Sequence, residues 1–268
     1  MDSLLNELKL LILLWIPQPR VFKYRRLSRA FNYIITSKQF ILKSRAIHSK
    51  PDLTIEEKNW CISRWFAMPP ASQSGYAAAI LSYRSNLELS FHQKASAFRP
   101  IPSSIGQLTD LTSLILEGCI LKGPIPLELF TLTNLETIKF DHNELIGTIS
   151  PLIGNLVNLR FLSFYQNHLV SGVPTEISQC SKLEYLNVSY NFLTETIPDS
   201  IGQLSCLHTL SFHFQTVEDY VVVRQLPLIP ALSQLTSLKV FHCNNPDDVE
   251  AIRKYLPNFN MEYDNLSF

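Results

Sequence analysis

The feature that most constrains this chain is a 24-residue repeat that begins near residue 101. Leu108, Leu132, Leu156, Cys180 and Leu204 are spaced 24 residues apart, and the segments around them align in one register. A single unit of this length cannot bury its own apolar face, so neighbouring units must stack to form a core. The repeat therefore predicts a solenoid of stacked units over this part of the chain.

The units follow the pattern LxxLxLxxN, in which other apolar residues can replace leucine. Alternate leucines of a short strand point inward while the residues between them face out. Asn143, Asn167 and Asn191 follow directly after the expected strands, where a buried amide could satisfy backbone groups of the turn. Proline prevents continued strand pairing, so Ile-Pro pairs are expected to begin the convex side. These pairs occur at 101–102, 125–126 and 197–198.

The motif resembles the leucine-rich repeats, specifically the plant-specific subtype with LxGxIPxxIGxL. The resemblance covers about residues 101–215 and implies an α/β solenoid, a horseshoe of about five to six repeats. Several positions depart from the consensus. They are Cys119 and Gln215 for the asparagine, Ser150 for the proline, and Ser171 and Glu195 for the glycine. We expect repeats over 101–245 with an insertion at about 216–231, then a C-terminal cap over 246–268.

The first 45 residues have a different pattern. Leu4, Leu8, Leu11 and Trp15 fall at steps of four and three, which is typical of an amphipathic helix, and Pro17 ends it. A second helix with apolar and arginine-rich faces follows. Two such helices form a poor core alone and are expected to contact a partner.

This segment resembles the F-box, because LLNELKLLILLWIP and YRRLSRAFNYIITSKQF follow its order and spacing over residues 3–42. It departs from the family at Leu5, where proline is usual, and at Phe31, where tryptophan is common. The resemblance implies a small all-α domain over 1–45 that docks on the Skp-type adaptor of a cullin-RING ubiquitin ligase. The implied adaptor-contacting residues are Leu4, Leu8, Ile12, Ile16, Pro17, Leu27 and Phe31. An ordinary two-helix cap on the repeats is the alternative.

Residues 46–100 are interpreted as a helical linker or N-terminal cap of the solenoid. Within them, GYAAAILSYRSNLELSF is compatible with a helix or with an atypical first strand that stacks on the repeats.

Charge and targeting features favour an intracellular protein. Residues 1–100 have 15 basic and 6 acidic side chains, a net charge of +9, and residues 101–268 have 8 and 17, a net of −9. The apolar run from Leu10 to Ile16 is far shorter than the roughly 20 residues of a membrane span, and no cleavage site follows it. Five scattered cysteines are interpreted as free thiols of a reducing compartment, cytoplasmic or nuclear. The basic stretch lacks a recognisable nucleic-acid-binding module.

No motif for catalysis is present. The seven histidines lack metal-ligand spacing, and neither a phosphate-binding loop nor a nucleophile motif occurs. We therefore expect a non-enzyme that has no cofactor, metal, small-molecule substrate or nucleic acid.

The expected binding surface is the concave face, which is formed by those side chains of the repeat strands that point away from the core. Aromatic residues with polar tips on an exposed sheet are typical interaction hot spots. The predicted target-binding residues are Lys139, Asp141, His142, Phe161, Tyr165, Tyr185, Tyr190, His213 and Phe214. The alternative is that the rings only pack against one another. The favoured function is the substrate-recognition subunit of a ubiquitin ligase. A plain leucine-rich-repeat scaffold or a receptor-like protein is the alternative.

Overall fold

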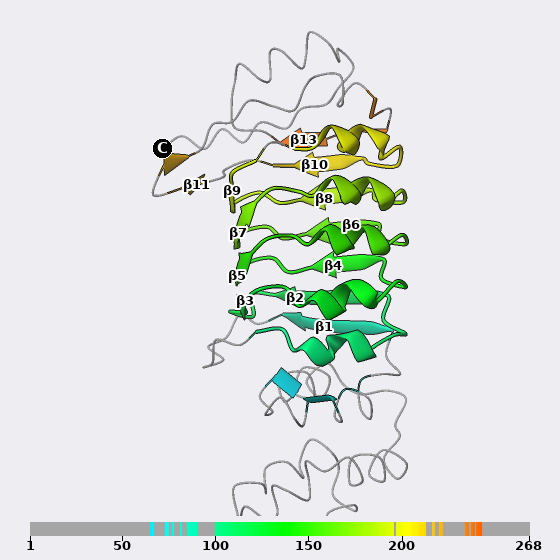
Figure 1. Cartoon of the computed structure of the whole chain (residues 1–268), viewed down its shortest axis with the longest axis vertical. Coiled ribbons are helices and arrows are strands. Elements are labelled where there is room, and N and C mark those ends of the chain that lie inside the picture. Colours follow the sequence, from blue (N-terminus) through cyan, green and yellow to red (C-terminus); the bar gives the residue numbers. More distant parts are fainter. Residues whose placement is uncertain are drawn as a thin grey trace, which may run out of the picture.

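The computed structural model describes residues 65–66, 73–74, 77, 81, 85–90, 100–195, 197–212, 216–217, 220–221, 234–235, 237–238 and 240–242. These residues form a solenoid in which successive turns of the chain stack along one long axis (Figure 1). The predicted F-box-like segment 1–45 and the predicted C-terminal cap 246–268 lie outside the described residues.

One wall of the solenoid is a seven-stranded parallel sheet with the order β1-β2-β4-β6-β8-β10-β13. Its strands are β1 (Asn86–Ser90), β2 (Ser113–Glu117), β4 (Thr137–Lys139), β6 (Phe161–Ser163), β8 (Tyr185–Asn187), β10 (Thr209–Ser211) and β13 (Val240–His242). From β2 to β10 the residues that face each other across neighbouring strands are 24 apart in sequence. After the insertion, β13 continues the sheet beside β10.

At the N-terminal end of the sheet, the segment that allowed either a helix or a strand contains β1. This strand pairs in parallel with β2, which places Leu87 opposite Leu114, and both side chains are fully buried. Trp65 is also fully buried, and its Nε1 donates to the Ser104 hydroxyl at 3.1 Å. Residues before the first regular repeat therefore extend the hydrophobic core of the solenoid.

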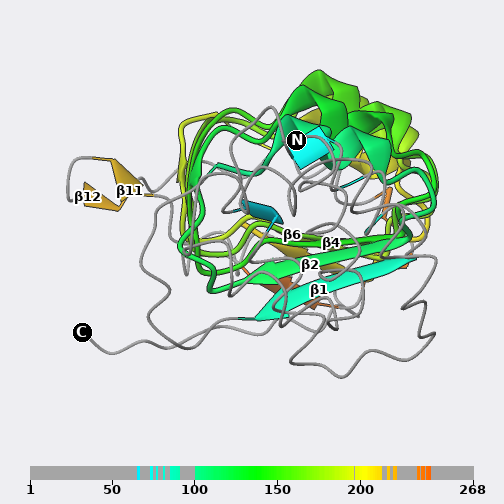
Figure 2. The ribbon, with the colours of Figure 1, turned by 90° about the horizontal axis from the view of Figure 1, so that it is seen from below.

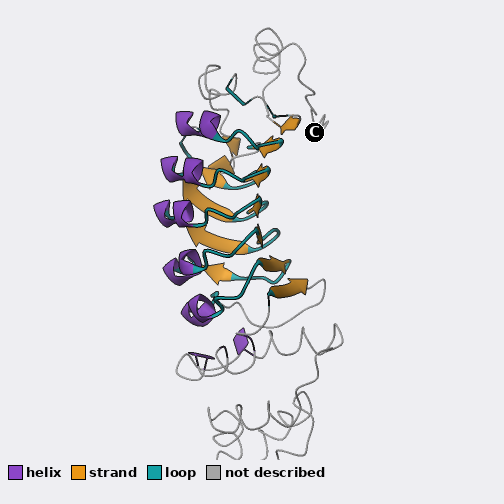
Figure 3. Cartoon of the chain, turned by 90° about the vertical axis from the view of Figure 1, so that its right-hand side faces the viewer, coloured by secondary structure: helices purple, strands orange, loops and turns teal. Residues whose placement is uncertain are grey.

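The convex side opposite this sheet consists of short 3-10 helices, one per repeat (Figure 3). They are η3 (Ser103–Gln107), η4 (Leu127–Thr131), η5 (Pro151–Asn155), η6 (Thr175–Gln179) and η7 (Asp199–Gln203). Proline precedes each helix except η5. There Ser150 replaces it, and the serine hydroxyl accepts a hydrogen bond from the Leu152 amide at 3.2 Å. The departure from consensus at this position thus retains an N-terminal cap.

Glycine on the convex side allows neighbouring helices to approach closely. A Cβ atom on Gly154 would lie 2.9 Å from the Glu176 carbonyl oxygen of the next repeat. That distance is shorter than carbon–oxygen contact allows, so the glycine of the IGxL motif sets the packing distance between η5 and η6.

A second, four-stranded sheet that the sequence did not predict lies along the side of the stack. It consists of β3 (Lys122–Gly123), β5 (Glu144–Gly147), β7 (His168–Ser171) and β9 (Phe192–Leu193). Gly123 and Gly147 end their strands with φ of +89° and +83°, which side chains with a Cβ rarely adopt. Viewed along the stack, each turn is a flattened loop with the main sheet opposite the 3-10 helices (Figure 2). A hairpin of β11 (Thr216–Val217) and β12 (Tyr220–Val221) projects beyond this second sheet, within the predicted insertion.

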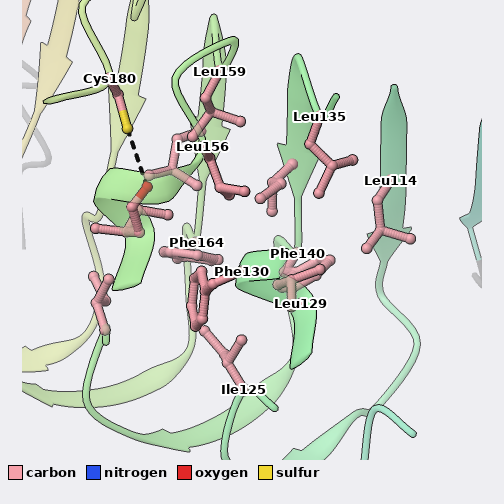
Figure 4. Packing of buried hydrophobic residues seen from close by; sticks show 14 of the residues in the cluster. Leu114, Ile125, Leu129, Phe130, Leu135, Phe140, Leu156, Leu159, Phe164 and Cys180 are labelled. Carbon is pink, nitrogen blue, oxygen red and sulfur yellow. Dashed lines mark hydrogen bonds between the residues drawn. The ribbon is translucent and has the colours of Figure 1, made fainter. Parts of the chain in front are cut away.

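The space between the walls is filled by inward-pointing side chains from every repeat. Phe130, Phe140 and Phe164 are fully buried and lie close together among leucines and isoleucines (Figure 4). The ring centroids of Phe140 and Phe164 are 5.8 Å apart. The strand β2 alternates between buried and half-buried positions. The predicted inward orientation of the repeat leucines is confirmed.

The three predicted asparagines form a buried ladder along one corner of the core. The Asn167 side chain is 3% exposed; its Oδ1 accepts from the Leu145 amide at 3.1 Å, and its Nδ2 donates to the Phe140 carbonyl at 2.8 Å. Asn143 and Asn191 make the equivalent bonds in the repeats on either side. Each asparagine satisfies buried backbone groups, as the sequence predicted, and it also joins its own turn to the preceding one.

Candidate recognition surface

The structure brings the predicted aromatic residues of the concave face together on β6 and β8. The stacking of equal repeats places Phe161 directly opposite Tyr185. Their ring centroids are 4.2 Å apart and their ring planes differ by 4°, so the rings are stacked. Both side chains remain half-buried, and the Tyr185 hydroxyl accepts a hydrogen bond from Asn187 Nδ2 at 3.2 Å. This bond directs the tyrosine ring along its strand.

A second aromatic group lies where the same strands end. Tyr165 contacts Tyr190 edge-to-face at a centroid distance of 5.2 Å, and His142 contacts Tyr165 in the same way at 5.0 Å. His142 and Tyr190 have positive φ angles of 56°, and both precede a ladder asparagine. This left-handed conformation is unusual for residues other than glycine. At both positions the following asparagine donates to the carbonyl of the preceding residue, Asp141 or Ser189, and so helps to hold the backbone that presents these two rings. We call Phe161, Tyr165, Tyr185 and Tyr190 the aromatic surface.

Asp141 was expected to be exposed on this face, but its side chain is buried and the residue is only 6% exposed. One carboxylate oxygen accepts a hydrogen bond from the Ser163 hydroxyl at 2.5 Å and another from the Tyr165 amide at 3.0 Å. Burial raises the pKa of Asp141, and this effect outweighs the opposing influence of the Ser163 hydrogen bond and of Lys139. The physical role of Asp141 is therefore to fix the backbone under Tyr165.

Lys139 lies beside this carboxylate and is already neutralised. Its Nζ is 2.9 Å from Glu117 Oε2 and 3.7 Å from Asp141 Oδ2. The hydrogen bond that the lysine donates to Glu117 is the largest of the effects that raise its pKa. With its charge balanced by two acids, Lys139 adds little net positive charge to the concave face.

A charged row that the sequence analysis missed borders the aromatic surface. Glu136, Arg160 and Glu184 each lie one residue before their strand, and they are 24 residues apart. Arg160 donates through Nη2 to Glu184 Oε1 at 2.6 Å, and this hydrogen bond is the main cause that raises the arginine pKa. The regular 24-residue spacing of alternating charges was the sequence feature that could have identified this row.

The lateral sheet presents another aromatic pair that was not predicted. His168 and Phe192 stack with a centroid distance of 5.3 Å, and the neighbouring Ile146 is 50% exposed. The remaining predicted site residues lie outside the described residues. They are His213 and Phe214 of the target-binding set and the adaptor-contacting residues Leu4, Leu8, Ile12, Ile16, Pro17, Leu27 and Phe31.

Neither metal-ligating nor membrane-spanning features are found in the described part of the chain. No group of three or more His, Cys, Asp or Glu side chains could hold a metal ion there. Within the same residues, no helix has the length and apolar character that a membrane crossing requires. Burial raises the pKa of the Cys180 thiol to about 12, which keeps it protonated and unreactive.

The stacked 24-residue turns, the parallel sheet and the asparagine ladder together define a leucine-rich-repeat solenoid. The Leucine Rich Repeat family matches residues 182–204. No curated protein shows a significant sequence match to the chain.

Three solved structures illustrate the similarity in fold. The ectodomain of the membrane receptor kinase GASSHO1/SCHENGEN3 from Arabidopsis thaliana, in complex with CASPARIAN STRIP INTEGRITY FACTOR 2, is 29% identical with a TM-score of 0.50. The match covers 63% of this chain and 20% of that ectodomain. A TDR receptor is 24% identical over 75% of this chain and 35% of its own, with a TM-score of 0.55. A plant ice-binding protein is 24% identical over 73% and 59%, with a TM-score of 0.53. The match thus covers only a fifth to about a third of these two receptor structures.

Proposed function

We propose that this chain is a non-catalytic protein-recognition module that binds a segment of a partner protein on its aromatic surface. The observation that carries the proposal is the stacked pair of Phe161 and Tyr185, which stays partly exposed on the concave face. Partly exposed aromatic rings provide large contact area and lose little side-chain entropy on binding. The rigid backbone beneath them reduces the entropy lost on binding further.

The size of the concave face favours an extended segment over a globular partner. Seven strands spaced by ~4.8 Å give a length of about 29 Å, and strand residues add a width of ~10–13 Å. The resulting area of roughly 300–400 Å² is half or less of the ~800 Å² that each partner contributes to a standard interface. A short extended peptide segment matches this area, and a larger partner would need to contact the β11–β12 hairpin as well.

A selection experiment tests peptide binding on the aromatic surface. A random 12-residue peptide library displayed on phage is selected against the full chain, and enriched peptides are measured by fluorescence polarisation. The double variant Phe161→Ala/Tyr185→Ala should lose binding. The variant His168→Ala/Phe192→Ala removes a comparable ring pair from the lateral sheet and should bind normally. Equal binding by both variants would place the ligand elsewhere and refute the proposal.

A more specific proposal is that the chain selects substrates for a Skp–cullin–F-box-type ubiquitin ligase, with residues 1–45 bound to the adaptor. Its support is the F-box-like order and spacing of LLNELKLLILLWIP and YRRLSRAFNYIITSKQF. A receptor-like role is the second candidate, favoured by the similarity to the GASSHO1/SCHENGEN3 ectodomain, whose structure contains a bound CASPARIAN STRIP INTEGRITY FACTOR 2.

Adaptor binding distinguishes the two candidates. The purified full chain is titrated with a Skp-type adaptor, beside the variant Ile12→Asp/Ile16→Asp. The ligase proposal expects a complex in the micromolar range or tighter that the double variant loses while its repeats remain folded. A folded, soluble wild-type chain that forms no complex would contradict the ligase proposal and leave the peptide-binding proposal unaffected.

A further inference from the structure

The concave face and its adjoining charged row have an excess of negative charge. The outward residues of β1 to β8 on this face, taken together with Asp141 and the charged row, include five acids and two bases, a formal net charge of −3. The acids are Glu88, Glu117, Glu136, Asp141 and Glu184, and the bases are Lys139 and Arg160. Both bases already form ion pairs with acids of this set. Asp141 is buried, so Glu88 and Glu136 are the exposed acids of this set that take part in neither of these ion pairs.

Glu136 is the acid best placed to act together with the stacked rings. Its carbonyl oxygen accepts the Phe161 amide at 3.0 Å, so the two residues are immediate neighbours across β4 and β6. Its side chain is exposed, and it forms no ion pair with any residue that the structure describes. Arg160 interacts with Glu136 electrostatically, but its direct ion pair is with Glu184. A cation lying over Phe161 would therefore be close to a carboxylate that is free of a direct ion pair among the described residues.

We propose that the aromatic surface selects a basic segment of a partner protein, in which an arginine or lysine side chain lies on the Phe161–Tyr185 pair with its charge near Glu136. This inference rests on the proposed function and specifies its ligand. The electron-rich face of an aromatic ring attracts a cation, and the aliphatic stem of the same side chain covers apolar ring surface. The net charge of −3 accelerates the approach of a positively charged segment and repels an acidic one.

The peptide library tests the ligand class. Peptides enriched on the full chain should have a net positive charge, with arginine or lysine next to an apolar residue. For one enriched peptide, the basic anchor is replaced by glutamine, and both peptides are titrated against wild type and Glu136→Gln. Glu136→Gln should weaken the basic peptide about two- to fivefold, as expected for an exposed ion pair. The glutamine peptide should bind both proteins equally.

Glu128→Gln provides the matched control, because Glu128 is an exposed glutamate on the convex helix η4. This variant should bind the basic peptide like wild type. Enriched peptides without basic residues, or equal weakening of both peptides by Glu136→Gln, would overturn the basic-ligand inference. In that case the proposed function would stand, provided that Phe161→Ala/Tyr185→Ala still abolished binding. An absence of any enriched peptide would contradict both proposals.

The chain contains a competing basic segment of its own. Residues 9–50 lack any acidic side chain, and the stretch RVFKYRRLSRAF combines arginine, lysine and aromatic residues. A synthetic peptide of residues 20–31 is therefore titrated beside the selected peptides. Tighter binding of this peptide than of every selected sequence would identify the occupant as the chain itself and would refute recognition of a partner segment.

Discussion

Replacing Asn167 by alanine tests whether the asparagine ladder holds the repeats together. The Asn167 amide joins two turns through bonds to the Leu145 amide at 3.1 Å and to the Phe140 carbonyl at 2.8 Å. It also donates to the Phe164 carbonyl of its own turn at 3.1 Å. A longer bond runs from the same amide to the Tyr165 carbonyl at 3.3 Å. Alanine at this position removes all four bonds and leaves the corner of the core without a polar side chain.

The size of the destabilisation depends on which backbone groups lose their last hydrogen-bond partner. The Phe140 carbonyl keeps its bond from Asn143 Nδ2 at 2.9 Å, and the Phe164 carbonyl keeps the bond from Asn191 at 2.9 Å. The Leu145 amide loses its side-chain acceptor inside the core. An unsatisfied buried donor costs ~1–3 kcal/mol, and the lost bonds to carbonyls that stay satisfied add about 1 kcal/mol. We therefore expect a loss of about 2–4 kcal/mol in the free energy of unfolding.

Urea denaturation followed by circular dichroism measures this loss, with Asn134→Ala as the matched control. Asn134 is exposed and makes a single bond, to the Thr109 carbonyl at 3.0 Å. The control should change the free energy of unfolding by no more than ~0.5 kcal/mol. Hydrogen exchange should accelerate at the Leu145 amide in the Asn167 variant. A loss in Asn167→Ala as small as in the control would refute the ladder argument.

Three further outcomes follow from the structure. Burial raises the folded-state pKa of Asp141 above its ordinary 3.8. The free energy of unfolding of the wild type should therefore fall, relative to that of Asp141→Asn, as pH rises from about 3.8 through the raised pKa. Urea denaturation of both proteins from pH 4 to 7 measures this difference, and a difference that stays constant with pH would contradict the prediction. N-ethylmaleimide at pH 8 should modify exposed Cys206 in the native protein but buried Cys180 only after unfolding, as measured by mass spectrometry. Equal rates of modification of the two cysteines in the native protein would refute this prediction. Gly154→Ala should destabilise by ~1–3 kcal/mol, because its Cβ would lie 2.9 Å from the Glu176 carbonyl oxygen, and an unchanged urea midpoint would show that η5 and η6 can separate freely.

The 24-residue period was sufficient to predict the contacts between repeats. Equal repeats in a stack place residues 24 apart side by side. The repeat length alone therefore predicted that Phe161 and Tyr185 are neighbours, and their pairing confirms it. The role of the asparagines was predictable for a similar reason. A polar amide that recurs among leucines after each strand must find backbone partners when it is buried.

The solvent exposure of a side chain on the concave face was less predictable than the direction in which the side chain points. The alternation of a strand specifies that Asp141 and Ser163 point outward, but it does not specify what covers them. Both are 6% exposed or less, because each hydrogen-bonds the other and half-buried rings lie on the same face. The lateral sheet escaped prediction because its strands contain only two to four residues, too few for a periodic pattern to emerge.

The asparagine ladder also determines the order in which the solenoid should lose structure. Nearest-neighbour coupling in a repeat protein makes unfolding proceed from weakly coupled ends. In the sequence, Cys119 and Gln215 replace asparagine in the repeats before and after those of Asn143, Asn167 and Asn191, so the strongest coupling is expected in the middle repeats. The aromatic surface lies on those repeats, and fraying at either end should therefore leave it intact. Partial thermal unfolding or proteolytic trimming of the ends would then shorten the solenoid before ligand binding is lost.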